Sequence, residues 1–166
     1  MPSPFEREPE APVSLIVNRQ SVTRHVPLRQ SLADFLREAL GYTGVHVGCE
    51  QGVCGACTIV MDDAIVRSCL VLAIQADGAI LETIEGATAT GRVKDLQDSF
   101  FERGAVQCGF CSAGMILTAA DLLAHDPMPS RAAIRGHLAG NYCRCTGYEA
   151  IVDAVESAAK KIATPP

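Results

Sequence analysis

Residues 48–58 read GCEQGVCGACT, and this stretch decides how the first half of the chain folds. It places cysteines at Cys49, Cys54 and Cys57, and the next cysteine, Cys69, follows Cys57 after eleven residues. A C-x4-C-x2-C run with a more distant fourth cysteine is the ligand spacing of plant-type [2Fe–2S] centres. These four cysteines are therefore candidate ligands of a two-iron cluster held in a tight loop.

Glycines surround these cysteines and suit the same purpose. Gly48, Gly52 and Gly55 lie beside and between them. A cluster with four thiolates is a buried anion, and it needs many N–H donors around its sulfur atoms. Because glycine has no Cβ and tolerates positive φ, it lets backbone amides approach sulfur closely. We interpret the three glycines as the residues that shape the cluster-binding loop.

A second quartet of cysteines has a different spacing. Cys108 and Cys111 form C-x2-C, and Cys143 and Cys145 form C-x-C after a gap of thirty-one residues. The gap has room for two helices, which would bring the four sulfur atoms together between them. Two one-electron centres in one small chain predict a role in electron transfer.

Two predicted helices begin next to the second quartet. Ser112 follows Cys111, Thr146 follows Cys145, and Ser and Thr are preferred N-cap residues. Helix N-termini carry partial positive charge and free N–H groups, so they attract anions. We therefore expect two helix N-termini to face the second cluster.

Zinc is the principal alternative to an iron–sulfur cluster as the metal bound by each quartet. Structural zinc prefers paired C-x2–4-C knuckles, which the first quartet lacks and the second partly shows. The second quartet alone therefore leaves zinc open, whereas its place beside a plant-type site favours iron. Four histidines have no ligand spacing, and we interpret them as structural residues: His25, His46, His125 and His137.

Composition argues against several other classes of protein. The 166-residue chain has a net charge of −5 and no long Lys/Arg run, so nucleic-acid binding is not expected. No apolar stretch approaches the roughly 20 residues that span a bilayer. The first twelve residues are rich in Pro and Glu and hold neither an apolar segment nor a twin-arginine signal. We expect a cytoplasmic protein, in which structural disulfides are rare and eight cysteines indicate metal.

Hydrophobic periodicity divides the chain into an α+β half and a helical half. In the first half, an apolar stripe capped by Ser31 predicts a helix that ends near Gly41. Alternating apolar and polar residues predict strands at 13–17 and 22–26, and three segments separated by turn residues predict further strands at 58–61, 65–70 and 80–84. The expected organisation is an N-terminal extension at 1–12, an α+β domain at 13–86, a small-residue linker at 87–92, a helical domain at 93–162 and a tail at 163–166.

Four helices are predicted in the second half. One spans 93–103, and one starts at Ser112 and ends at Asp126, before a proline. The latter is apolar nearly all round, so it should be buried. Ser130 caps the third, which stops at Gly140. The sequence from Thr146 to Glu149 is predicted to be the capping box of the last helix.

The cysteine motifs resemble those of a known family. They are GCEQGVCGACT (48–58), RSCL (67–70), QCGFCSAGM (107–115) and GNYCRCTGY (140–148). They are similar to the small iron–sulfur subunit of the molybdenum hydroxylases, the xanthine dehydrogenase family. The likeness covers about residues 13–162 and is greatest to small subunits of bacterial N-heteroaromatic hydroxylases of the quinoline oxidoreductase type.

The resemblance implies a fold, cofactors and partners. The fold would be a plant-type ferredoxin-like β-grasp domain followed by a four-helix bundle. The chain would carry two [2Fe–2S] clusters, the second-quartet cluster nearest the molybdenum and the plant-type cluster toward FAD. Gln107 and Cys145 match positions that contact the pterin, commonly molybdopterin cytosine dinucleotide in bacteria. The partners would be a large molybdopterin-binding subunit and a medium FAD-binding subunit, assembled as a dimer of heterotrimers.

From this resemblance we expect the iron–sulfur subunit of a molybdenum-containing oxidoreductase, with no catalytic residue of its own. It would relay electrons from the molybdopterin centre through two clusters to FAD or another acceptor. The reaction would be hydroxylation of an N-heteroaromatic compound or an aldehyde. Two alternatives belong to other classes: a free-standing ferredoxin-like carrier, against which the helical half argues, and a zinc-stabilised binding module.

Overall fold

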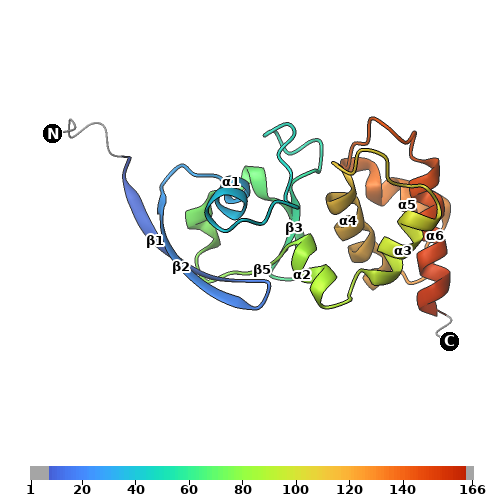
Figure 1. Ribbon diagram of the computed structural model, residues 1–166, viewed down its shortest axis with the longest axis horizontal. Coiled ribbons are helices and arrows are strands. Elements are labelled where there is room, and N and C mark those ends of the chain that lie inside the picture. Colours follow the sequence, from blue (N-terminus) through green and yellow to red (C-terminus); the bar gives the residue numbers. More distant parts are fainter. Residues whose placement is uncertain (1–7, 164–166) are drawn as a thin grey trace.

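The computed structural model describes residues 8–163 and shows two packed units with one short helix between them (Figure 1). The first unit is built on a sheet, and the second is built from helices. Strand β1 and helix α6 lie at opposite ends of the elongated molecule. The predicted α+β class is confirmed.

Two tight hairpins organise the sheet of the first unit. Asn18 and Arg19 close the β1–β2 hairpin, and their φ angles of 51° and 68° are those that a two-residue type I′ turn needs. Asp62 and Asp63, with φ of 48° and 66°, close β3–β4 in the same way. The strands are β1 (Glu10–Val17), β2 (Gln20–Pro27), β3 (Thr58–Met61), β4 (Ala64–Arg67) and β5 (Ile80–Glu82).

The strand order is β2-β1-β5-β3-β4, with β1 and β5 parallel and the other neighbours antiparallel. Along β1, the buried residues Val13, Leu15 and Val17 alternate with exposed ones, as predicted. The strand starts earlier than predicted, because residues 10–12 of the expected N-terminal extension pair with β2. Residues 1–7 of that extension and 164–166 of the tail lie outside the described residues.

A short helical segment packs its apolar side against the core of this unit. Helix α1 (Leu32–Asp34) continues as a π-helical turn at Phe35–Ala39. The Ser31 hydroxyl accepts a hydrogen bond from the Asp34 amide over 3.1 Å and donates to the Asp34 carboxylate over 2.7 Å. The predicted cap and helix are confirmed. The predicted strand at 65–70 is shorter than expected, because Ser68–Leu70 form a 3₁₀ turn.

Helix α2 (Ile84–Ala89) occupies the boundary between the two units (Figure 1). The linker expected at 87–92 therefore begins inside a helix, and the expectation needs correction for its first three residues. Small side chains there allow close packing: Ala87 is fully buried, and a Cβ on Gly86 would lie 2.1 Å from Asn18 Oδ1. The small residues reflect contact with the β1–β2 turn as well as a domain boundary.

Four helices share the core of the second unit. They are α3 (Lys94–Glu102), α4 (Ser112–His125), α5 (Arg131–His137), which a 3₁₀ turn extends to Gly140, and α6 (Glu149–Ala163). Every residue of α4 from Ala113 to Ala120 is buried, as its all-round apolar pattern predicts. This helix contacts β3 and β4 of the first unit as well as α3 and α5 of its own. Among the helices at residues 8–163, none has the length and apolar character needed to cross a membrane.

The helix caps of the second unit follow the sequence in part. Ser130 caps α5 as predicted, since its hydroxyl accepts from the Ala133 amide over 3.2 Å. Asp126 ends α4, also as predicted. Ser112 is not the N-cap of α4, however, because that position falls on Cys111, which makes no side-chain cap bond. The cysteine itself therefore stands at the helix start.

Candidate metal centres

The loop between α1 and β3 gathers three cysteines of the first quartet. The backbone amides of Gln51 and Cys54 each donate to Cys49 Sγ over 3.4 Å. These bonds, that of Gln51 foremost, lower the pKa of the Cys49 thiol to about 7. Amide donors thus stabilise the thiolate, which is the form of cysteine that binds metals.

The four sulfur atoms of the first quartet associate in two pairs. The Cys54 thiol lies beside Cys49, and the Cys69 thiol lies beside Cys57; each neighbour raises the pKa of the thiol next to it. Burial, followed by the contact with Cys57, raises the pKa of Cys69 to about 11. Burial also raises the pKa of Cys54. Four thiolates in such a space would repel one another, and bound cations remove that repulsion.

The three loop glycines serve two purposes. Gly52 and Gly55 have φ angles of 76° and 72°, a conformation that glycine adopts without strain. Gly48 is not among the glycines with a positive φ. A Cβ on Gly48 would instead lie 3.2 Å from Cys54 Sγ and 3.3 Å from Phe110 Cε1. Gly48 therefore provides space beside a sulfur atom.

The second quartet also forms two pairs. Cys145 Sγ lies 3.6 Å from Cys108 Sγ, and the Cys111 thiol lies beside Cys143. Burial, followed by the contact with Cys143, raises the pKa of Cys111 to about 12. Cys108 and Cys145 are exposed. Because Cys111 is the N-cap of α4, one helix N-terminus lies at this site as predicted.

The last helix does not begin at the second site, which corrects the predicted capping box. Helix α6 begins at Glu149, and the Tyr148 carbonyl accepts its first bond, from the Val152 amide. The Thr146 hydroxyl instead donates to Cys143 Sγ over 3.1 Å. Burial raises the pKa of Cys143, but bonds from Thr146 and nearby amides outweigh it and lower the pKa overall. Thr146 therefore acts on a cysteine and not on the helix.

The paired sulfur atoms at both sites fit two-iron clusters better than zinc. A [2Fe–2S] centre has four cysteine ligands divided between two irons, so two pairs match it. Structural zinc needs four ligands around one ion. The thiol sets and their amide donors therefore have the chemistry of two [2Fe–2S] sites.

A buried polar network joins the two sites, and sequence reasoning missed it. Asn141, which is 1% exposed, donates its side-chain amide to the Gly55 carbonyl over 3.1 Å. Its side-chain oxygen accepts from the Thr118 hydroxyl (3.1 Å) and from Arg67 (3.3 Å). Arg67 also donates to the Gly140 carbonyl over 2.8 Å. The only sequence signal is that Arg67 and Asn141 each stand two residues before a cysteine.

Replacing Asn141 by alanine is expected to lower the free energy of unfolding by about 2 kcal/mol. The buried Thr118 hydroxyl would lose its acceptor, and the Gly55 carbonyl would lose one donor while keeping its bonds from Thr58. A buried polar group left without a partner costs about 1–3 kcal/mol. Urea unfolding of the cluster-loaded chain, followed by circular dichroism, measures the change. Gln20→Ala, which removes an exposed side-chain amide, is the control; equal stability of the two variants would contradict this role of Asn141.

A backbone hydrogen bond connects the two sites directly. The Tyr142 amide, adjacent to Cys143, donates to the carbonyl of Cys54 over 2.8 Å. One cysteine of each quartet is thus linked through a single hydrogen bond. At the second site, Gln107 is exposed like Cys108 and Cys145. The two sites are therefore connected on one side, the inner side, by Asn141 and the Tyr142 amide. The opposite side, the outer edge, is exposed at Gln107, Cys108 and Cys145.

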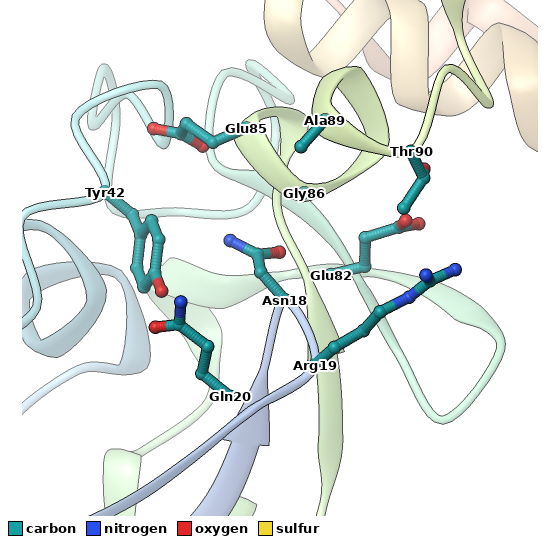
Figure 2. Close-up of a pocket in the computed structure, with 9 residues that line it drawn as sticks. All are labelled: Asn18, Arg19, Gln20, Tyr42, Glu82, Glu85, Gly86, Ala89 and Thr90. Atoms are coloured by element: carbon teal, nitrogen blue, oxygen red, sulfur yellow. The ribbon is translucent and has the colours of Figure 1, made fainter.

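A pocket of about 400 Å³ lies between the β1–β2 turn, β5 and α2 (Figure 2). Three of its polar side chains form bonds within the fold itself. Asn18 exchanges hydrogen bonds with Thr83, and Glu82 forms an ion pair with Arg92. Glu85 accepts from a backbone amide and from a hydroxyl. The polar residues around the pocket therefore help to hold α2 against the sheet.

Two family models together cover most of the chain. Residues 15–82 match the 2Fe-2S iron-sulfur cluster binding domain, and residues 83–156 match the [2Fe-2S] binding domain. The chain is 46% identical over 161 residues to the nicotine 6-hydroxylase small subunit of Paenarthrobacter nicotinovorans, covering 97% of this chain and 95% of that one. It is 48% identical over 150 residues to caffeine dehydrogenase subunit gamma of Pseudomonas sp. (strain CBB1), covering 87% and 89%.

A solved structure shows the same likeness in three dimensions. A chain of quinoline 2-oxidoreductase from Pseudomonas putida 86 has a TM-score of 0.87 and 49% identity, covering 92% of this chain and 95% of that one. The chain belongs to the small iron–sulfur subunits of the molybdenum hydroxylases. This small subunit carries two [2Fe–2S] clusters and transfers electrons in a multi-subunit oxidoreductase. The family, the electron-transfer role and the cluster type predicted from the sequence are confirmed.

Proposed function

We propose that all eight cysteines are cluster ligands. The observation that carries this proposal is the pairing of the sulfur atoms in both quartets. When bound, each cluster accepts and releases one electron; the chain supplies thiolates and amide donors that stabilise its negative charge. The two ligand sets are Cys49, Cys54, Cys57 and Cys69 for the plant-type cluster, and Cys108, Cys111, Cys143 and Cys145 for the second.

We infer that the second site faces the large molybdopterin-binding subunit. Gln107 and Cys145, the positions that resemble pterin contacts, lie with Cys108 at the exposed outer edge. Cys111 is buried against the helical core on the inner side. Electrons would then enter at the second site and leave from the plant-type site toward FAD on a medium subunit. The proposed pterin is the cytosine dinucleotide form.

We propose that the complex hydroxylates an N-heteroaromatic compound. Nicotine, caffeine and quinoline, which the names of the similar proteins give, are all nitrogen heterocycles. An aldehyde is the second candidate, because the chain is also 47% identical over 134 residues to an aldehyde oxidoreductase of Megalodesulfovibrio gigas. That match spans 15% of the longer protein, so it supports a shared electron-transfer part more than a shared substrate.

The finer description of the fold and the assembly is also a proposal. The mixed sheet with α1 beside it supports a β-grasp domain at about 13–86, and the shared core of α3–α6 supports a four-helix bundle at about 93–162. Helix α2 spans the boundary between them. The proposed assembly is a cytoplasmic dimer of heterotrimers.

The first experiment is metal and subunit analysis of the complex isolated from its host with a tag on this chain. Iron and molybdenum in a ratio of about four to one, as two two-iron clusters per molybdenum require, are expected together with two larger subunits. The same preparation is then assayed with nicotine, quinoline, caffeine and benzaldehyde. Oxidation of a heterocycle in preference to the aldehyde is the expected result.

Other outcomes of that analysis would refute parts of the proposal. Iron without molybdenum or partner subunits would indicate a free-standing carrier. Zinc without iron would contradict the assignment of the cysteines. Oxidation of benzaldehyde alone would keep the subunit assignment and overturn the substrate class.

A further inference from the structure

An aromatic stack connects the two cysteine-bearing loops. The ring centroids of His46 and Phe110 lie 4.6 Å apart, and the planes differ by 24°. His46 stands three residues before Cys49 of the first quartet, and Phe110 stands between two cysteines of the second. Offset stacking at this distance is a favourable geometry for aromatic rings. One ring from each loop therefore contributes to the contact.

Phe110 makes this contact although the loop that carries it is exposed to solvent. The residue is 44% exposed. Within the described chain, no hydrogen bond joins residues 106–110 to the sheet unit. The Phe110 ring also lies close above Gly48, because a Cβ there would be 3.3 Å from its Cε1 atom and 3.2 Å from Cys54 Sγ. The stack thus ties the loop of the second quartet to the backbone beside a first-quartet sulfur atom.

Hydrogen bonding does not account for the position of the His46 ring. Its Nδ1 atom is buried and has no hydrogen-bond partner among the described residues. Burial of an unpaired polar atom is unfavourable, and outward rotation of the ring would return Nδ1 to water. The stack with Phe110 is a contact that favours the observed position.

We propose that His46 and Phe110 form a clasp that positions the two cysteine quartets relative to each other. On the inner side, Asn141 and the Tyr142 amide already join the sites. The clasp makes a second tie at the Cys108–Cys111 loop. With a single connection, the two loops could rotate relative to each other about that connection. A second connection at a separate point prevents this rotation. His46 and Phe110 are positioning residues, and the inference rests on the proposed role of the cysteines as cluster ligands.

The benefit of the clasp follows from the physics of electron transfer. The rate of electron exchange between two centres falls steeply as their separation grows. A loop with few hydrogen bonds would let that separation vary, because such segments open at low free-energy cost. By holding the ring of one loop over the backbone of the other, the clasp keeps the separation short and constant.

Hydrogen exchange tests the clasp independently of turnover. In His46→Ala, exchange is measured at the Ser112 amide, which is bonded to Gly109 over 3.1 Å on the opposite loop. In Phe110→Ala, the reporter is the amide of residue 46, bonded to Ala56 over 3.3 Å. The full chain carrying its clusters is used. Each variant is expected to raise exchange several-fold at the reporter of the other loop, because linked sites affect each other reciprocally.

Two further variants separate stacking from other roles. His46→Phe keeps an aromatic ring and removes the unpaired nitrogen, so wild-type exchange is expected. Phe101→Ala removes a phenyl ring that is 86% exposed, and no change at either reporter is expected. A second readout is the electron paramagnetic resonance interaction between the two reduced clusters, which should weaken in His46→Ala and return in His46→Phe.

The results distinguish failure of the clasp from failure of the proposed function. Absence of two [2Fe–2S] signals in the wild-type chain would refute the cysteine assignment. Two normal signals with unchanged exchange at the Ser112 amide in His46→Ala would overturn the clasp alone. The clasp is also overturned if His46→Phe behaves like His46→Ala.

Discussion

Replacing Cys145 by serine is expected to remove the second cluster and to reduce turnover of the complex to near zero. Cys145 Sγ lies 3.6 Å from Cys108 Sγ, as one half of a proposed ligand pair. A serine hydroxyl is a poor substitute because it is not ionised at neutral pH. Iron should fall from about four to about two atoms per chain, and one of two [2Fe–2S] resonance signals should disappear.

The same variant tests the proposed order of the clusters. If electrons enter at the second site, the plant-type cluster should stay oxidised when Cys145→Ser receives the heterocycle that the wild-type complex oxidises. Cys54→Ser is the matched control, because it should also lower iron to about two atoms but remove the other cluster. In that control the remaining signal should still appear on addition of substrate. Substrate-dependent reduction of the plant-type cluster in Cys145→Ser, or normal turnover, would contradict the order.

Features of the fold that depend on near neighbours were predictable from the sequence. Strand β1 alternates buried and exposed residues as predicted, and a tight turn at Asn18 and Arg19 joins it to β2. The burial of α4 follows from its all-round apolar composition, and the cap at Ser130 follows from its residue type. Each of these signals lies within a few residues of the feature that it determines.

The capping box at Thr146 shows where such local reasoning fails. Serine and threonine have several possible partners, and the local pattern does not rank them. In the structure the Thr146 hydroxyl donates a hydrogen bond to Cys143 Sγ. Gly147 and Tyr148 have φ angles of 66° and 71°, which are not helical, so the helix begins only at Glu149. The Glu149 carboxylate then pairs with Arg131 and Arg135 of α5 instead of closing a box.

The candidate site divides in the same way. The eight cysteines could be selected from spacing alone, because ligand spacing is a local property. Their pairing, and the residues that join the two sites, depend on contacts between distant segments. Asn141 and Gly55, which are hydrogen-bonded, are 86 residues apart in the chain. His46 had no ligand spacing, and its stacking on Phe110 appears only after the two units pack.

Replacing Gly114 by alanine is expected to separate the two units and to lower the free energy of unfolding by about 3 kcal/mol. Gly114 lies in the first turn of α4, where that helix crosses the loop of the first quartet. A Cβ there would lie 2.2 Å from the Gly55 carbonyl oxygen and 3.1 Å from the Asn141 side-chain nitrogen. The obstructing atom belongs to the backbone, so no side-chain rotation relieves the overlap. The buried bond between Asn141 and Gly55 would be broken by the shift.

Gly136→Ala provides the matched control, because Gly136 lies in helix α5 and a Cβ there meets nothing within 4 Å. Removing glycine from a helix interior is expected to add about 0.5–1 kcal/mol of stability. The two variants therefore make the same chemical change with opposite expected signs, and urea unfolding of the cluster-loaded chain separates them. Hydrogen exchange at the Tyr142 amide, which bonds to Cys54, should rise in Gly114→Ala and stay unchanged in the control. Equal stability of the two variants would show that the α4 contact with the first-quartet loop does not hold the units together.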